Sequence, residues 1–329
     1  MLTSVRYENF RILKNAILPL SRSTLILGPN SSGKSTALTG LDILRRHASN
    51  SSRPPLFSRK LIDQESSQVL IEGTWDSPPG TTFVRFEGGQ ATGESRTATR
   101  STMPMPQALA TLRLFAFDAK AIAAPVQVQP NATLQDDGAG LAMVLTSLQD
   151  RHPEHFDELN REFSRWLPQF DRILFDTPSV GHRGFMLRSA SSRKSFRATE
   201  LSHGVLLALA ILTVAHLPSP PEILCLEEPD RGIHPRLLRN VYDAMQRLAY
   251  PEASGDNRRP TQVICTSHSP YLLDFYRDHP EDVVLSNLGT EGANFKRLSD
   301  LPHIREILGD VSLGDAWYTG ILGGVPATQ

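Results

Sequence analysis

A glycine-rich stretch near the N-terminus constrains the fold of this chain more than any other feature. Residues 28–36 read Gly-Pro-Asn-Ser-Ser-Gly-Lys-Ser-Thr and fit the phosphate-binding loop pattern, in which four free residues separate Gly from Gly-Lys-Ser. Residues 23–27 before the loop form an apolar run typical of a buried strand, and residues 36–44 after it have the spacing of an amphipathic helix. This order predicts an α/β fold with a phosphate held at a helix N-terminus.

The residue types of the loop match the chemistry of a nucleotide phosphate. Glycine lets the backbone turn tightly, so that successive N–H groups point at one phosphate group. We expect Lys34 to reach the β- and γ-phosphates of ATP and the Ser35 hydroxyl to hold Mg²⁺. The loop residues that we assign to ATP binding are Gly28, Pro29, Asn30, Ser31, Ser32, Gly33, Lys34, Ser35 and Thr36. The alternative, a chance glycine-rich turn, is disfavoured by the flanking strand and helix.

Size, charge and cysteine content narrow the remaining classes of protein. The 329 residues suffice for one large α/β domain or for a core with a lobe, and the formal net charge of −1 gives no overall basic field for nucleic acid. The most basic stretch, residues 183–197, is either a solvated hairpin or a contact for a phosphate backbone. Two cysteines in apolar runs exclude a disulfide framework. Without a long apolar run or signal-peptide core, we expect a cytoplasmic protein with no membrane insertion.

Two further apolar runs end in polar residues suited to ATP hydrolysis. Residues 222–226 lead into Glu227, which we expect to hold Mg²⁺ through water, and Glu228, which would orient or deprotonate the attacking water. The alternative for this acid pair is the start of a helix. Residues 262–267 lead into His268, which could bond the γ-phosphate. Since Ser267 is adjacent to His268, the two cannot face each other as nucleophile and base, and a serine hydrolase is disfavoured.

A third segment opens the long apolar helix predicted over residues 206–216. Ser202 is a good N-cap residue, and Gly204 keeps the helix start open. A cap is all that the local pattern demands. An exposed helix N-terminus can also bind an anion, including a phosphate held by another subunit.

Several weaker patterns complete the chain. Residues 10–15 form a turn that either rests near a bound base or is a plain hairpin turn. Residues 92–106 are polar and predict a loop. Strands are predicted over residues 2–7, 16–20, 68–75, 81–86, 112–117, 170–175 and 184–188, and helices over 138–149 and 152–167.

Taken in order, these segments resemble ATPases of the ATP-binding-cassette type, in the branch with RecF-like and SMC-like heads. Residues 28–36 look like Walker A, residues 201–204 like the signature motif and residues 223–228 like Walker B. Residues 229–235 resemble the D-loop of that branch, and residues 266–270 its switch-histidine loop. The resemblance implies a mostly parallel sheet with an antiparallel β portion and a helical lobe. It places ATPase core segments at residues 1–137 and 216–329 and the lobe with the signature at 138–215.

The chain departs from this pattern at several positions. Glu227 stands where most cassette ATPases have Asp, and His203 where the signature usually has another polar residue. The glutamine of the Q-loop is not assigned, with Gln68 and Gln135 as weak candidates. No coiled coil precedes the signature, and only about sixty residues follow His268, so we expect no toprim nuclease domain of the kind found in overcoming-lysogenisation-defect relatives.

The resemblance implies a homodimer that clamps ATP. Ser202 and Gly204 of one protomer would face the γ-phosphate held by Lys34 of the other, and hydrolysis at Glu228 would open the dimer. Such a switch implies a separately encoded effector, frequently in bacterial defence against phage, or a DNA transaction. The alternatives are the ATPase subunit of a membrane transporter, a RecF-like DNA-binding ATPase of DNA repair, and a non-catalytic nucleotide-binding scaffold.

Overall fold

The structure is a computed structural model that describes residues 1–49, 68–88, 90–99, 101–104, 106–130, 132–302, 304 and 311–322. The chain divides into two compact units. We call the first the core unit (residues 1–114, 221–227 and 256–329) and the second the lobe unit (residues 115–220 and 228–255). The order of the motifs along the chain predicts boundaries between core and lobe at residues 137 and 215. These boundaries stay a prediction.

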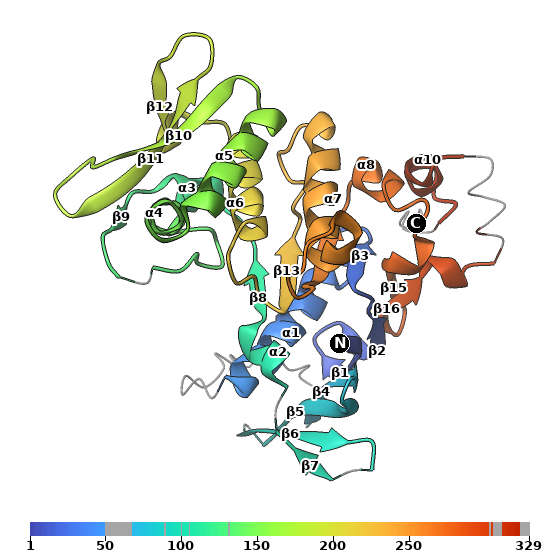
Figure 1. Cartoon of the computed structure of the whole chain (residues 1–329). Helices are drawn as coiled ribbons and strands as arrows, with labels where there is room; N and C mark the ends of the chain where they lie inside the picture. The colour runs from blue at the N-terminus through green and yellow to red at the C-terminus, as the bar shows by residue number, and fades with distance from the viewer. Residues whose placement is uncertain are drawn as a thin grey trace. The chain divides into compact units, whose positions relative to one another are not determined.

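A six-stranded sheet carries the functional segments of the core unit (Figure 1). Its central strands β15, β3, β14 and β13 run parallel, and β16 pairs antiparallel with β15. In spatial order the strands are β16 (Gly292–Arg297), β15 (Val283–Gly289), β3 (Ser23–Leu27), β14 (Gln262–Ser267), β13 (Ile223–Glu227) and β8 (Arg113–Phe115). Every residue of β3 and β14 is buried, which explains their apolar runs without polar alternation. The predicted α/β fold with a mostly parallel sheet is confirmed.

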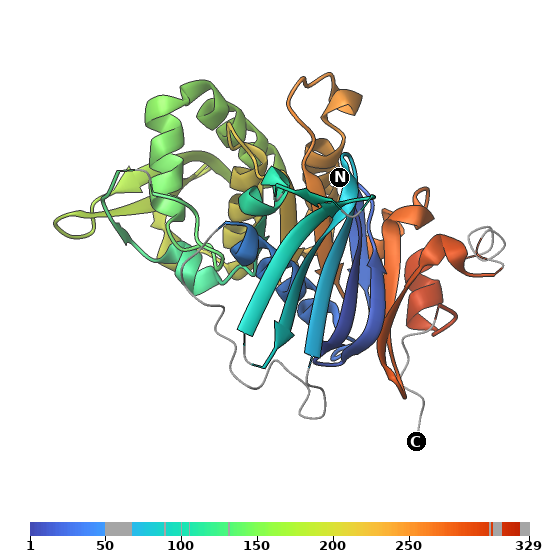
Figure 2. The same ribbon diagram turned by 90° about the horizontal axis from the view of Figure 1, so that it is seen from below.

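The N-terminal part of the chain forms a second, antiparallel sheet, and Figure 2 shows its strands side by side. In spatial order it contains β2 (Leu13–Pro19), β1 (Leu2–Phe10), β4 (Gln68–Asp76), β5 (Pro79–Glu87), β6 (Gln90–Thr97) and β7 (Thr102–Met103). The loop predicted over residues 92–106 is therefore wrong at residues 92–97 and at Thr102–Met103, which are strands. Strand β6 is paired with β5 along its whole length, and all of its residues except Ser95 are exposed or half-buried.

Helix α1 (Lys34–Ala48) joins the two sheets of the core unit through one apolar cluster. Its buried residues pack with residues of β1 and β4 on the antiparallel sheet and with residues of β13 and β14 on the parallel sheet. Tyr7 donates a 2.9 Å hydrogen bond to the carbonyl of Ala37, and its ring leaves no room for a Cβ at Gly40. Gln262 at the start of β14 bonds both the N–H and the carbonyl of Leu2. The other helices among the described residues of the core unit are α2 (Gln107–Thr111), α8 (Pro270–Asp274) and α10 (Leu313–Tyr318).

The lobe unit combines helices with a small antiparallel sheet of β10 (Phe170–Asp176), β11 (His182–Ser189) and β12 (Ser195–Arg197), which β9 (Val126–Gln127) extends. Its helices are α3 (Ala119–Ala123), α4 (Leu141–Arg151), α5 (Pro153–Trp166), α6 (His203–Ala215) and α7 (Pro235–Ala249). Helix α6 is buried at every position from Val205 to Ala215, so its sequence is apolar all round. In the described parts of the two units, the 3₁₀ helices are η2 (Ala198–Glu200), η3 (Pro251–Ser254), η4 (Pro280–Asp282) and η5 (Leu298–Asp300).

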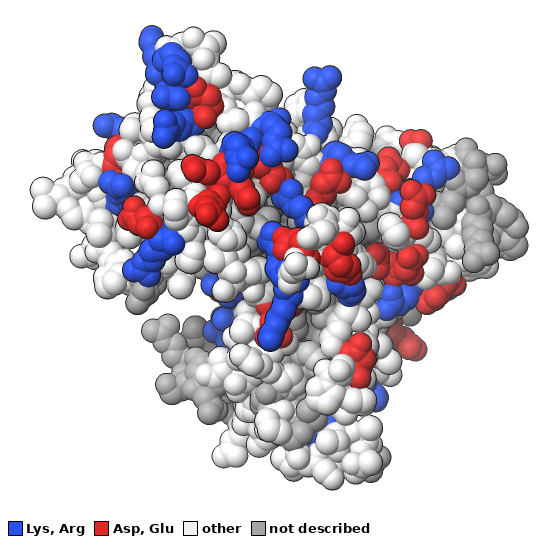
Figure 3. Space-filling model, viewed as in Figure 1, with Lys and Arg blue, Asp and Glu red and all other residues white. Residues whose placement is uncertain are grey.

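The basic stretch of the lobe unit is partly neutralised by its own acids. Arg188 makes a two-bond ion pair with Asp171, which also pairs with Arg193. Arg197 pairs with Asp176 at 3.3 Å. On the face shown in Figure 3, basic side chains gather at the upper left, where Figure 1 places β10–β12, and acidic side chains lie beside them. These pairs favour the solvated hairpin over a contact for a phosphate backbone.

Candidate functional site

Three strands of the parallel sheet end side by side and bring three predicted segments of the core unit to one edge. Leu27 at the end of β3 pairs with Ser267 at the end of β14, and Thr266 pairs with Glu227 at the end of β13. The phosphate-binding loop, Glu227 and His268 follow or complete these strands. They therefore share the carboxyl edge of the sheet, where open α/β sheets bind their ligands.

The loop itself turns through two left-handed residues into helix α1. Ser31 has φ 62° and Gly33 has φ 105°, and only glycine adopts the second value without strain. Lys34 is buried, and its Nζ donates hydrogen bonds to the carbonyls of Gly28 (2.8 Å) and Pro29 (2.9 Å). The Lys34 ammonium group is thus held by loop carbonyls. From a phosphate-binding loop, a lysine in this position can reach the phosphate oxygens of a nucleotide.

The neighbouring strand β15 supports the loop through Ser286, a residue that no motif singled out. Its Oγ donates a 2.7 Å hydrogen bond to the carbonyl of Ser32, and both residues are buried. A Cβ on Gly28 would lie 2.4 Å from the carbonyl oxygen of Ser286, so the first glycine of the loop is required by this contact. The only sequence signal for Ser286 is a polar residue that follows the apolar run Val283–Leu285.

The β1–β2 turn contacts the loop from another direction. The carbonyl of Ile12 accepts a 2.8 Å hydrogen bond from the N–H of Ala293 at the start of β16. A Cβ on Gly33 would lie 3.0 Å from the methyl group of Ala293 and 3.1 Å from Leu13. The turn at residues 10–15 therefore lies against the phosphate-binding loop, and its contact with a bound base stays a prediction.

The loop offers an environment that fits a nucleotide phosphate with Mg²⁺. Within the described part of the chain, the buried Ser32 Oγ has no hydrogen-bond partner, and the first turn of α1 presents N–H groups that the helix does not satisfy. Ser35 is exposed at the start of this helix. Ser35 and Glu227 offer the oxygen ligands that Mg²⁺ prefers. Among the described residues, no group of three or more His, Cys, Asp or Glu is placed to hold a metal ion.

The two adjacent acids belong to different units. Glu227 is the last residue of β13 in the core unit, whereas Glu228 begins a segment of the lobe unit. Glu228 has φ 46°, a left-handed conformation that is uncommon for a residue with a side chain and clusters at functional sites. Its carbonyl accepts a 3.0 Å hydrogen bond from the N–H of Arg231, which closes the turn that leads towards α7.

The signature segment also lies in the lobe unit. Ser202 occupies the N-cap position of α6, as predicted, but it is exposed and its side chain makes no capping hydrogen bond. A Cβ on Gly204 would lie 2.5 Å from the carbonyl oxygen of Gly232 in the predicted D-loop. Gly204 thus allows a close backbone approach, a packing role that the sequence did not reveal, and its contact with a phosphate stays a prediction.

A buried charge network connects the other end of α6 to α7. Glu162 of α5 accepts hydrogen bonds from His216 Nε2 (2.8 Å) and Arg247 Nη2 (2.9 Å). Burial raises the pKa of Glu162, but these hydrogen bonds and the charge of Arg247 outweigh burial and lower the pKa from 4.5 to about 2. The contact of Gly204 with Gly232 and this network therefore join α6 and α7 within the lobe unit at two places.

The two weak Q-loop candidates make local contacts. Gln68 begins β4 and bonds the carboxylate of Glu87 at 3.3 Å. Gln135 bonds the carbonyl of Thr133 at 3.1 Å. Neither contact involves the phosphate-binding loop, so the Q-loop residue stays unassigned.

Solved structures share this arrangement of strands and helices. The first is an SMC head bound to the C-winged helix domain of ScpA, with a TM-score of 0.62, 12% identity, and coverage of 90% of this chain and 96% of that chain. The chain has the fold of an SMC head. A second SMC head, with an extended coiled coil and derived from Pyrococcus furiosus, gives a TM-score of 0.56 at 12% identity over 97% and 98% of the two chains. The predicted resemblance to SMC-like heads is thus confirmed at the level of the fold.

A family comparison supports the same class of domain. Residues 129–274 match the family described as "AAA domain, putative AbiEii toxin, Type IV TA system". A comparison with curated proteins gives no match. The family match covers less than half of the chain and does not include the phosphate-binding loop, so what is shown for the chain as a whole is the fold of an SMC head. Among the described residues, no helix has the length and apolar character to cross a membrane.

Proposed function

We propose that this protein binds and hydrolyses ATP, and that ATP-dependent dimerisation makes it a switch for a partner protein. The observation that carries the proposal is the shared carboxyl edge of β3, β13 and β14. Their register brings the phosphate-binding loop, Glu227 and His268 together in the core unit. A nucleotide-binding scaffold needs only the loop, whereas an acid and a histidine beside the loop supply groups for hydrolysis.

Each residue has a defined task in this proposal. Loop N–H groups and Lys34 bind the phosphates, and Ser35 with Glu227 holds Mg²⁺, which supplies charge neutralisation when bound. Glu228 orients the attacking water and accepts its proton. His268 donates a hydrogen bond to the γ-phosphate, where negative charge develops during phosphoryl transfer.

The exposed signature segment supports a site shared between two copies of the chain. Ser202 makes no capping bond, so its hydroxyl and the first N–H groups of α6 can bind an anion from outside the protomer. In the proposed dimer, this anion is the γ-phosphate of the ATP that the second copy holds. ATP then bridges the protomers, and hydrolysis weakens the bridge.

Steady-state hydrolysis of ATP with Mg²⁺ tests the enzymatic part of this proposal. Wild type should release phosphate, and Glu228→Gln and Lys34→Ala should each reduce kcat by about a hundredfold or more, because they remove the base or the phosphate ligand. Glu158→Gln on the exposed face of α5 is the control that should stay at the wild-type rate. Equal rates for wild type and Glu228→Gln would refute the assigned role.

The partner is proposed to be a separately encoded effector in defence against phage. The support is the family description, because a toxin of a two-component system acts beside a second protein. Purification of the tagged Glu228→Gln variant with ATP, followed by mass spectrometry, tests this assignment. One protein retained with ATP and released without ATP is the expected result, and retention of nucleic acid alone would refute it in favour of a DNA transaction.

A further inference from the structure

The core unit contains a pocket at the opposite end of the same parallel strands. Arg22, Glu222 and Thr261 line it, and each lies directly before one of the strands β3, β13 and β14. The phosphate-binding loop follows β3 at its other end. Because β3 has five residues at about 3.3 Å each, the pocket and the loop are separated by roughly 16 Å of strand. The pocket is therefore distinct from the proposed ATP site.

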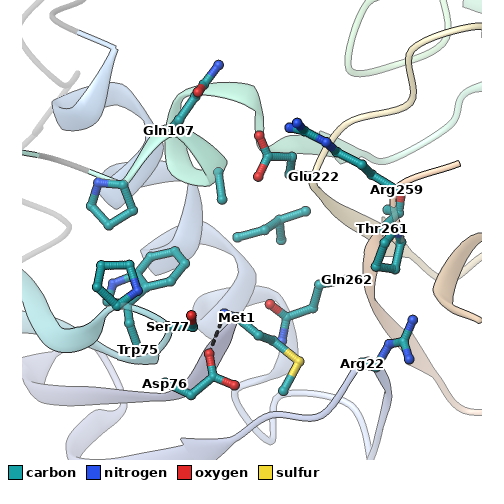
Figure 4. Close-up of a pocket in the computed structure, with 15 residues that line it drawn as sticks. Met1, Arg22, Trp75, Asp76, Ser77, Gln107, Glu222, Arg259, Thr261 and Gln262 are labelled. Carbon is teal, nitrogen blue, oxygen red and sulfur yellow. Dashed lines mark hydrogen bonds and ion pairs between the residues drawn. The ribbon is translucent and has the colours of Figure 1, made fainter.

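The pocket has the size and lining of a small-ligand site. Its volume is about 530 Å³, within the range of roughly 300–1,000 Å³ that is usual for ligand pockets. The apolar lining consists of Met1, Trp75, Pro78, Pro106, Ala108, Ile223 and Pro260. Figure 4 shows Arg22, Thr261 and Arg259 along one side, with Glu222 next to Arg259 in this view and Trp75 on the opposite side.

Several polar groups in the lining are already used by the fold. The indole N–H of Trp75 donates to Thr82, and the Thr261 hydroxyl donates to the carbonyl of Pro221. The Gln262 amide bonds backbone atoms of Leu2 and Ser21. Asp76 pairs with the amino group of Met1. These groups shape the pocket but have little capacity for a ligand.

Two side chains with opposite charge are available instead. Arg259 has no ion pair within the described part of the chain, whereas the adjacent Arg258 pairs with Asp256 at 2.5 Å. The carboxylate of Glu222 likewise has no ion pair among the described residues, and the hydrogen bonds of Glu222 to Thr111 and Gln262 are made by its backbone N–H and carbonyl. A guanidinium binds a carboxylate through two parallel hydrogen bonds, and a carboxylate beside it attracts an N–H donor.

We propose that this pocket binds the C-terminal residue of a peptide or a free amino acid with an apolar side chain. Such a ligand carries a carboxylate for Arg259, an adjacent N–H donor for Glu222 and an apolar group for the surface formed by Met1, Trp75 and Ile223. A single amino-acid residue thus supplies the carboxylate, the N–H donor and the apolar group that this lining can bind. Capture of a C-terminal carboxylate is an established mode of peptide recognition.

Isothermal titration of the full chain with matched probes tests this proposal and requires no ATPase activity. The probes are L-leucine, L-methionine and L-phenylalanine, each also as the last residue of a Gly-Gly tripeptide with a free carboxylate or with a C-terminal amide. At least one carboxylate probe should bind, and its amide should bind at least about tenfold more weakly, because the amide removes the anion that the guanidinium recognises. Tighter binding of the tripeptide identifies a protein C-terminus as the source, and tighter binding of the amino acid identifies a metabolite.

Two variants place the binding in this pocket. Arg259→Gln should weaken binding of the carboxylate probe about tenfold. Arg258→Gln, at the adjacent position outside the lining, should leave the affinity for this probe unchanged. Glu222→Gln should weaken binding of the amino acid more than binding of the tripeptide, because only the amino acid carries a charged ammonium group on the same carbon atom as the carboxylate. The proposal is overturned if no carboxylate probe binds wild type at millimolar concentration, if the amide binds equally well, or if Arg259→Gln binds as wild type does.

Discussion

At the scale of single residues, Ser286 extends the phosphate-binding site beyond its motif. The buried bond from Ser286 Oγ to the Ser32 carbonyl fixes the loop before any nucleotide arrives. Because a preformed loop costs less ordering on binding, Ser286 should influence affinity more than catalysis.

We therefore predict that Ser286→Ala weakens ATP binding about two- to tenfold and leaves kcat nearly unchanged. A net hydrogen bond of about 0.5–1.5 kcal/mol corresponds to this range of affinity. Titration with a fluorescent ATP analogue measures the change, and Ser254→Ala, which loses a hydroxyl bond within a 3₁₀ helix, is the control. An unchanged dissociation constant would show that β15 does not support the loop.

Gly204 is the second residue whose role depends on packing. Since a Cβ would lie 2.5 Å from the Gly232 carbonyl oxygen, Gly204→Ala should force α6 away from the turn before α7. We predict a loss of unfolding free energy of about 1–3 kcal/mol, measured by urea denaturation. Gly289→Ala is the matched control, because its Cβ would find only contacts of 3.6 Å or more. If both variants unfold at the same urea concentration, the close approach has no energetic role.

At the scale of elements, the Glu162 network should make the stability of the lobe unit depend on pH. The pKa of Glu162 is lowered from 4.5 to about 2 in the folded chain, so its stabilisation is present above pH 4.5 and is lost as pH falls towards 2. This lowering of the Glu162 pKa corresponds to a contribution of about 3 kcal/mol to the free energy of unfolding.

Urea denaturation at several pH values measures this effect. The unfolding free energy of wild type should fall steeply between pH 4.5 and pH 2, and Glu162→Gln should be less stable at neutral pH with a weaker dependence on pH. Glu158→Gln on the exposed face of the same helix should keep the wild-type profile. Parallel profiles of wild type and Glu162→Gln would contradict the assignment.

Elements with a strong local pattern could be predicted from the sequence, and those that depend on partners could not. The strands that precede residue 28, Glu228 and His268 are buried apolar runs, so their position in a parallel sheet follows from composition. Strand β6 is polar, and its pairing with β5 and β7 makes it a strand. Ser286 contacts Ser32 of the phosphate-binding loop, and Gly232 contacts Gly204 of the signature segment. In each pair the two residues lie far apart in the sequence, so no local pattern reveals the contact.

At the scale of the whole molecule, the division into units passes between the two predicted acids. Glu227 belongs to the core unit with the phosphate-binding loop and His268, whereas Glu228 belongs to the lobe unit with Ser202 and Gly204. The core unit therefore carries the proposed phosphate and Mg²⁺ ligands, and the lobe unit carries Glu228 and the signature segment.

The molar mass of Glu228→Gln in solution tests the central claim of a shared ATP site most directly. By size exclusion with light scattering, this variant should have the mass of a single 36.4 kDa chain without nucleotide and twice that mass with ATP and Mg²⁺. Adding Ser202→Arg, at an exposed position, should keep ATP bound and return the mass to that of the single chain. A single-chain mass for Glu228→Gln with ATP bound, or a dimer that Ser202→Arg leaves intact, would contradict the account.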